Sequence, residues 1–87
     1  MSDRLNRTAV RELRRVFGGE HLADTVVSLG TPDEQGWAEA ELALEDGEIG
    51  LGQLVALSPG VEVLEPVELR AALAGIGAEL AARNAQR

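Results

Sequence analysis

Residues 37–45, Trp-Ala-Glu-Ala-Glu-Leu-Ala-Leu-Glu, form the most regular segment of the sequence. One side of the alternation is apolar and the other is mostly acidic, with Ala38, Ala40, Leu42 and Leu44 on the first and Trp37, Glu39, Glu41, Ala43 and Glu45 on the second. A period of two with one apolar side predicts a strand whose sheet is buried on one face and solvated on the other.

Other elements are predicted on both sides of this strand. In chain order they are a helix at 8–17, a strand at 24–29, the strand at 37–45, a helix from a cap at Asp46 to about Ser58, a strand at 61–65 and a final helix opened by Pro66. Apolar residues recur at helical spacing in the first and last of these helices. The order α-β-β-α-β-α predicts an α+β fold, with helices on one face of a small, mainly antiparallel sheet.

The length and the charge distribution limit the possible functions. A chain of 87 residues forms a single domain. Its net charge of −7 divides into +3 over residues 1–17, −12 over residues 18–69 and +2 over residues 70–87. The central segment contains no Lys or Arg, and such a surface repels phosphate. The sequence therefore argues against direct binding of duplex DNA.

The residue types also argue against several kinds of site and location. The chain has no Cys, so it forms no disulfide, thiolate nucleophile or thiolate zinc site. No apolar run approaches the ~20 residues that a membrane span needs, and the start is not typical of a signal peptide. We therefore expect a cytoplasmic protein that binds no membrane and no cofactor.

A resemblance to a known family rests on two stretches. Gly36-Trp37 opens the alternating strand, and residues 61–66 read Val-Glu-Val-Leu-Glu-Pro, followed after one residue by Glu68-Leu69-Arg70. Over about residues 36–84 the chain resembles the C-terminal extension, or WCX domain, of WYL-domain transcriptional regulators of bacteria. The resemblance implies a ferredoxin-like βαββαβ sandwich followed by a closing helix. It also implies a regulatory role in forming a homodimer and in the response of the WYL domain to an effector, which can be single-stranded nucleic acid.

The chain differs from this family pattern in two respects. The winged-helix and WYL domains expected upstream are not in the sequence, so residues 1–87 are interpreted as one isolated domain of this type. In addition, the first strand of a ferredoxin-like sheet is central and should be apolar. Residues 1–7 do not fit this requirement and are expected to be flexible, as are residues 85–87. Either the strand at 61–65 pairs directly and in parallel beside the strand at 37–45, or a strand of a second chain fills the gap in a homodimer.

Several patterns resemble catalytic or metal sites, but simpler interpretations are favoured. His21 is the only histidine and is expected to be solvated or to cap a helix. His21, Asp24 and Ser28 include the residue types of a hydrolase triad, yet they lie in one short stretch without a nucleophile elbow. Alternation alone places Glu39, Glu41 and Glu45 on one solvated face. The sequence therefore predicts neither a catalytic site nor a metal site.

The candidate functional residues belong to an interaction surface. They are a basic stripe on the first helix, the only Trp and one further Arg, namely Arg11, Arg14, Arg15, Trp37 and Arg70. We expect the stripe to dock against the acidic centre of a second subunit or against nucleic acid held by a neighbouring domain. The alternative function is a small-molecule sensor of the amino-acid-binding type, with its ligand at a helix start such as residues 47–52, between two chains. A small hydrolase of similar fold is a third possibility, for which the sequence offers no anion holder.

Overall fold

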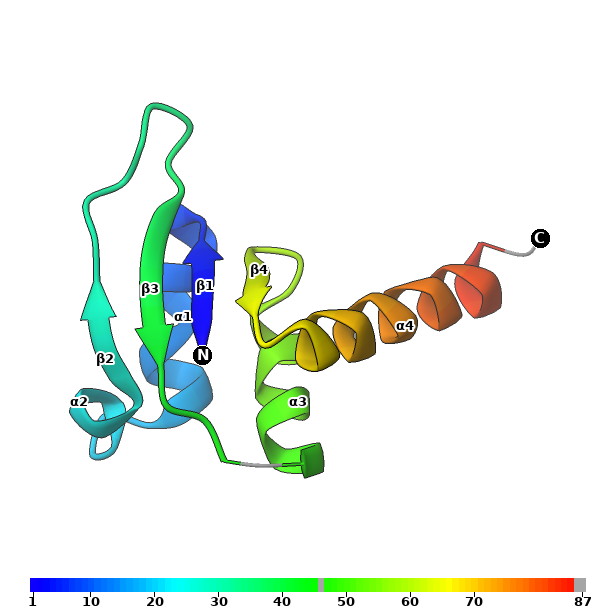
Figure 1. The fold of residues 1–87 in the computed structure, drawn as a ribbon, viewed down its shortest axis with the longest axis horizontal. Helices are drawn as coiled ribbons and strands as arrows, with labels where there is room; N and C mark the ends of the chain where they lie inside the picture. Colours follow the sequence, from blue (N-terminus) through cyan, green and yellow to red (C-terminus); the bar gives the residue numbers. More distant parts are fainter. Residues whose placement is uncertain (46, 86–87) are drawn as a thin grey trace.

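A computed structural model describes residues 1–45 and 47–85, which form one sheet and the helices around it (Figure 1). The strands are β1 (Ser2–Leu5), β2 (Val26–Leu29), β3 (Ala38–Leu42) and β4 (Val61–Glu65). The helices are α1 (Arg7–Phe17), α2 (Leu22–Thr25), α3 (Gly47–Leu57) and α4 (Val67–Asn84). The predicted cap Asp46 lies outside the described residues, as do residues 86–87 of the end expected to be flexible.

The sheet confirms the α+β, ferredoxin-like prediction. Its strand order is β2-β3-β1-β4, and every neighbouring pair is antiparallel. With the single turn α2 set aside, the chain order is βαββαβ followed by α4. Helices α1 and α3 cover one face of the sheet, so the chain forms two layers.

The predicted absence of the first strand is wrong. Residues 2–5, within the segment expected to be flexible, form β1 at the centre of the sheet. β1 pairs with β3 on one side and with β4 on the other, so β4 does not lie directly beside β3 and no strand from a second chain is needed there.

A short, polar strand can be central here because its backbone is bonded on both sides. Asp3 and Leu5 face the helices and are fully buried, whereas Ser2 and Arg4 face the open side of the sheet. Only two positions of β1 point inward, and one of them is a carboxylate. The apolar alternation that marks a strand is therefore not visible in this part of the sequence.

The core lies between the sheet and the two covering helices. α1 begins after Asn6, whose side chain accepts a hydrogen bond of 2.9 Å from the backbone N–H of Ala9. Buried residues of α1 and α3 then pack against buried residues of the strands, with Ala9, Leu13, Phe17, Leu54 and Leu57 from the helices and Leu5, Ala40, Leu42, Val61 and Val63 from the sheet. Because a Cβ at Gly60 would overlap the side chain of Asn6, glycine allows β4 to approach the start of α1.

Two predicted strands are shorter than expected. The segment predicted at 24–29 begins in α2, and β2 starts only at Val26. The segment predicted at 37–45 pairs as a strand from Ala38 to Leu42, and its alternation of buried and more exposed residues is confirmed there. Leu44 lies beyond β3 but still packs at the edge of the core.

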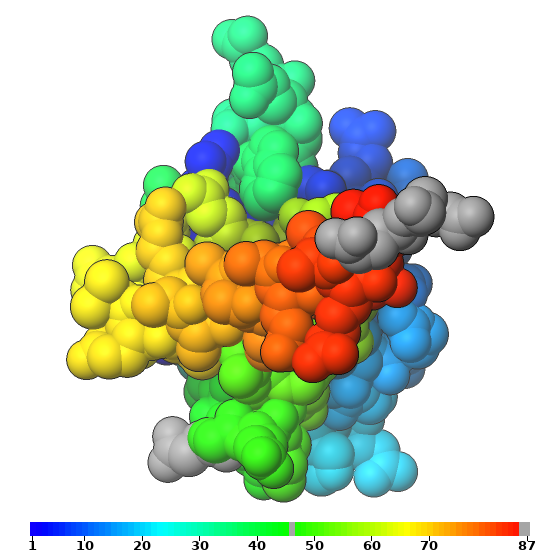
Figure 2. All heavy atoms as spheres, turned by 90° about the vertical axis from the view of Figure 1, so that its right-hand side faces the viewer, coloured from blue at the N-terminus to red at the C-terminus, as the bar shows by residue number. Residues whose placement is uncertain are grey.

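The final helix, α4, is less buried than α1 and α3. It starts after Pro66 and contacts α3 and the strand β4 at the edge of the sheet. In Figure 1 it leaves the end of β4 and points away from the sheet. Figure 2 shows it crossing in front of α3 and β4. None of its residues from Val67 to Asn84 is buried.

Candidate interaction surfaces

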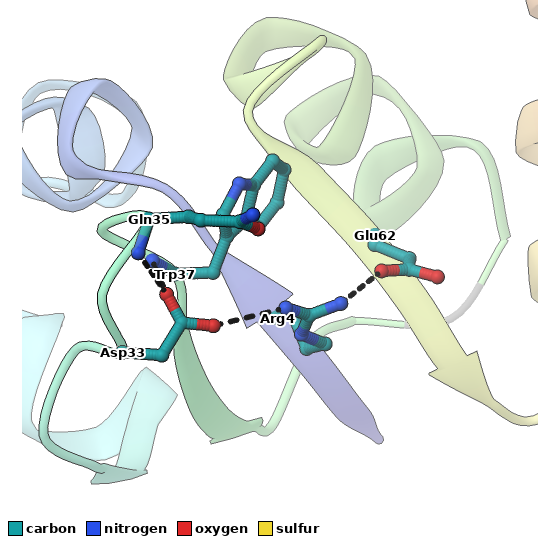
Figure 3. Close-up of polar contacts among 5 residues, drawn as sticks. All are labelled: Arg4, Asp33, Gln35, Trp37 and Glu62. Atoms are coloured by element: carbon teal, nitrogen blue, oxygen red, sulfur yellow. Dashed lines mark hydrogen bonds and ion pairs between the residues drawn. The ribbon is translucent and has the colours of Figure 1, made fainter.

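A polar cluster occupies the open face of the sheet around Arg4 (Figure 3). The Arg4 guanidinium donates to Glu62 of β4 at 3.0 Å and to Asp33 of the β2–β3 loop at 3.3 Å. It also lies 5.5 Å from the centre of the Trp37 ring, within the range of a cation–π contact. Arg4 of β1 therefore links the β2–β3 loop to β4 on this face of the sheet.

The loop that carries Trp37 is held by Asp33. The Asp33 carboxylate accepts hydrogen bonds of 2.9 Å from the backbone N–H groups of Trp37 and Gln35. These bonds, that from Trp37 foremost, lower the pKa of Asp33, and the nearby Arg4 acts in the same direction. Asp33 therefore stays ionised and fixes the position of the Trp37 backbone.

Arg70 joins this cluster through Glu62. Its guanidinium lies 3.8 Å from the Glu62 carboxylate, which also binds Arg4. Trp37 and Arg70 together border an apolar hollow of about 490 Å³ between β4 and α4. We call this hollow the α4 groove; its apolar lining includes Trp37, Pro59, Val61, Leu73, Ile76 and Leu80. Trp37 and Arg70, two of the predicted interface residues, therefore border the same hollow.

The other predicted interface residues lie elsewhere. Arg11, Arg14 and Arg15 are exposed on α1, which covers the opposite face of the sheet from Arg4 and Trp37. Arg15 donates to Glu12 at 2.6 Å within the same helix. The five predicted residues therefore form two surfaces rather than one.

Arg4 is the main residue that the sequence analysis missed. Residues 1–7 lack the apolar pattern that marks a strand, so no role for Arg4 is predicted from them. The one signal for it is that Arg4 belongs to the five arginines of residues 1–17, which precede the long acidic centre. The charge pattern does not show which carboxylates Arg4 contacts.

A larger hollow lies at the start of α3, where the sensor alternative placed its ligand. It measures about 850 Å³, and its lining includes Leu44, Glu45, Gly47, Gly50, Leu51 and Leu69. We call it the α3 cavity. Gly50 is buried, and a Cβ there would overlap the backbone carbonyl of Glu45, so the chain before α3 passes close to the helix.

The carboxylates of β3 are used in structural contacts. Glu41 accepts hydrogen bonds from the Met1 ammonium at 2.9 Å and from the Ser2 hydroxyl at 3.0 Å. The bond from Met1, followed by that from Ser2, lowers the pKa of Glu41. Glu39 shares the open face of the sheet, whereas Glu45 lies beyond the strand and lines the α3 cavity. The three residues therefore do not form one site.

The remaining candidates have no special environment. His21 is exposed and precedes α2 without a side-chain capping bond. Within residues 1–45 and 47–85, no group of three or more His, Asp or Glu side chains is arranged to hold a metal ion. In the same residues, no helix is both long enough and apolar enough to cross a membrane.

The fold and the surfaces together define a ferredoxin-like α+β module with an additional, poorly covered C-terminal helix. Residues 4–81 match the family model of the WCX domain, so the chain belongs to the WCX domain family. WCX domains are associated with WYL-type regulators. Neither the curated proteins nor the solved structures contain a match to the chain.

Proposed function

We propose that this chain is a non-enzymatic oligomerisation and regulatory module of a bacterial WYL-type transcriptional regulator. Membership of the WCX domain family supports the regulatory context. The observation that carries the proposal is the incomplete burial of α4. Its apolar stripe, Leu69, Leu73, Ile76 and Leu80, faces the body of the protein, yet none of these side chains is fully covered.

A second subunit would stabilise α4 by covering this stripe. Helices in water depend on packing of an apolar face more than on propensity. Gly75 and Gly77 weaken α4 further, at about 1 kcal/mol each relative to Ala. Leu80 is 50% exposed, so covering it would contribute about 1 kcal/mol, half the value of burying a whole Leu side chain. The α4 groove beside the stripe offers a concave apolar surface for such a contact.

The regulatory mechanism follows from the same arrangement. Effector binding in a neighbouring WYL domain would favour one packing of two subunits over another, and the interface at α4 would carry the difference. The acidic character of residues 18–69 is consistent with a module that leaves contact with duplex DNA to the winged helix.

Sedimentation equilibrium tests the proposal. We expect the chain to sediment at twice its mass of 9.2 kDa at high concentration. Ile76→Asp and Leu80→Asp, which place a charge in the stripe, should each weaken the dimer about tenfold or more. Val27→Asp is the matched control, because Val27 is exposed on β2, far from α4 in the sheet order. A monomer at every concentration would overturn the proposal.

The sensor alternative is favoured by one observation, the α3 cavity at the predicted helix start. A ligand that binds only the folded state raises the melting temperature, and the rise grows as the ligand concentration exceeds its Kd. Ala72 of α4 lines this cavity, so Ala72→Trp would fill it. In a panel of free amino acids, the sensor function predicts a rise in Tm for wild type and no rise for Ala72→Trp. Equal behaviour of both proteins with every compound would exclude this function.

A further inference from the structure

The α4 groove is an elongated hollow that a single chain forms by itself. On one side α4 lines it from Arg70 to Leu80, a stretch that spans about 15 Å at the rise of an α-helix. The remaining lining includes Trp37, Pro59 and Val61. In Figure 2 the helix crosses in front of β4, with which it encloses the groove. The volume of about 490 Å³ is within the range of small-molecule sites.

One end of the groove carries a positive charge. Among the described residues that line the groove, Arg70 is the only basic one, and its side chain is 54% exposed. Within residues 1–45 and 47–85 its only ion pair is with Glu62, at 3.8 Å. This distance is too long for a hydrogen bond, so the Arg70 guanidinium is accessible to a further acceptor.

The carboxylate at the same end is already bound. Glu62 accepts a hydrogen bond of 3.0 Å from Arg4, whose other partner, Asp33, does not line the groove (Figure 3). The donors that still lack an acceptor at this end therefore belong to Arg70. The net charge of −7 opposes an approaching anion, but charges more than about 10 Å away are largely screened in 0.1 M salt.

The rest of the groove is apolar and poorly covered. Along α4, Arg70 is followed at helical spacing by Leu73, Ile76 and Leu80. Leu80, at the far end, is 50% exposed, so an apolar occupant would remove hydrocarbon surface from water. A guanidinium at one end and hydrocarbon along the remaining length match a molecule with an anionic head and an apolar chain.

We propose that the α4 groove binds a small carboxylic acid with an apolar chain, of the class of medium-chain fatty acids. The carboxylate accepts hydrogen bonds from the Arg70 guanidinium, whose fork can bind both oxygens. The chain lies along Leu73, Ile76 and Leu80. One chain forms the whole site, so this inference does not depend on the dimer of the proposed function.

The fluorescence of Trp37 tests the proposal, because Trp37 is the only Trp and borders the groove. The titrations use protein dilute enough to sediment as a monomer. Octanoate should change the emission in a saturable manner. Octylammonium, with the same chain and the opposite charge, should bind far more weakly, as should acetate, which has the head without the chain.

The role of Arg70 is tested by removing its charge. Arg70→Gln should weaken octanoate binding about tenfold, the loss expected for one hydrogen bond to a charged group. Its affinity for octanol, which has no charge, should equal that of wild type. The matched control is Arg83→Gln, on the same helix but outside the groove lining, which should bind octanoate like wild type.

The position of the ligand is tested by filling the groove. Gly77 lines the groove, and a Cβ there would meet no atom within 4 Å, so Gly77→Leu places a side chain in the hollow without a clash. Gly75 has the same open surroundings but does not line the groove, so Gly75→Leu is the matched control. Both substitutions favour the helix, so neither should unfold the protein. Gly77→Leu should prevent octanoate binding, whereas Gly75→Leu should bind it like wild type.

The other possible results would overturn the inference. Absence of a saturable response to octanoate would exclude the site. Equal affinity for octanoate and octylammonium, or no loss in Arg70→Gln, would contradict the assignment of the carboxylate to Arg70. Equal binding by Gly77→Leu and Gly75→Leu would place the ligand outside the groove. A wild-type chain that binds octanoate but stays monomeric at every concentration would support this site and overturn the proposed function.

Discussion

Asp3 is the only charged side chain in the buried set of described residues, and both of its carboxylate oxygens lack a hydrogen-bond partner. It lies on the central strand, between Ala40 of β3 and Val63 of β4. Desolvation raises its pKa from 3.8 to about 7; the Met1 ammonium acts against this rise, and Glu41 adds to it. Asp3 therefore carries a proton in the folded protein at pH values where it is ionised in the unfolded chain.

This shift predicts a stability that falls as the pH rises. Because the folded pKa is above the unfolded value, the contribution of Asp3 is greatest below pH 3.8 and is lost as the pH rises to about 7. Between pH 5 and 8 the loss is roughly 3 kcal/mol, from 1.36 kcal/mol per pKa unit. In urea unfolding, Asp3→Asn should remove most of this slope. An equal slope in both proteins would contradict the assignment.

A second prediction at the residue scale concerns Arg4. Its ion pairs are partly exposed, so Arg4→Ala should lower the free energy of unfolding by only about 1 kcal/mol. Because Trp37 is the only Trp, the fluorescence of the protein reports on the ring beside Arg4. The variant should shift the Trp37 emission to longer wavelength as water replaces the guanidinium. Arg83→Ala, on the distant part of α4, should leave the emission unchanged.

At the scale of elements, a helix or strand is predictable from the sequence when it is long enough to show a clear apolar period. β3, α1 and β4 repeat their patterns over enough residues to be recognised, and each was predicted within a few residues of its observed bounds. β1 has four residues with one buried carboxylate, so neither periodicity nor composition identifies it. Its strand conformation comes from backbone pairing with β3 and β4, segments distant in the chain.

The central position of β1 predicts a large effect from a small change. Leu5 is fully buried against α1 and the neighbouring strands, so Leu5→Ala should lower the free energy of unfolding by about 2–4 kcal/mol. Ser2→Ala, on the open face of the same strand, should change it by less than about 1 kcal/mol. Denaturant titration distinguishes the two. A small effect at Leu5 would indicate that β1 is not part of the core.

At the scale of the whole molecule, the two surfaces have different chemistry. The α4 groove and its stripe are apolar, whereas α1 exposes the arginines Arg11, Arg14 and Arg15. The sequence predicted an interface from Arg11, Arg14, Arg15, Trp37 and Arg70 together. Only the tertiary structure separated them, because α1 and the Trp37 loop lie on opposite faces of the sheet.

Dimerisation predicts that thermal stability depends on protein concentration. Because association stabilises only the folded state, the Tm should rise by a few degrees for each hundredfold increase in concentration. The variant Leu80→Asp, with its weaker dimer, should need about tenfold or more higher protein concentration to reach the same Tm. A wild-type Tm that does not change with concentration would argue against a dimer in this range.

The sequence alone determined the α+β class, the alternating face of β3, the division of charge and the family resemblance, because each is a local pattern. The tertiary structure decided the central place of β1, the burial of Asp3 and the contacts of Arg4 with Asp33, Trp37 and Glu62. It also showed how little of α4 is covered. These properties depend on which distant segments come together, and pairing across a sheet carries no signature within four residues of chain.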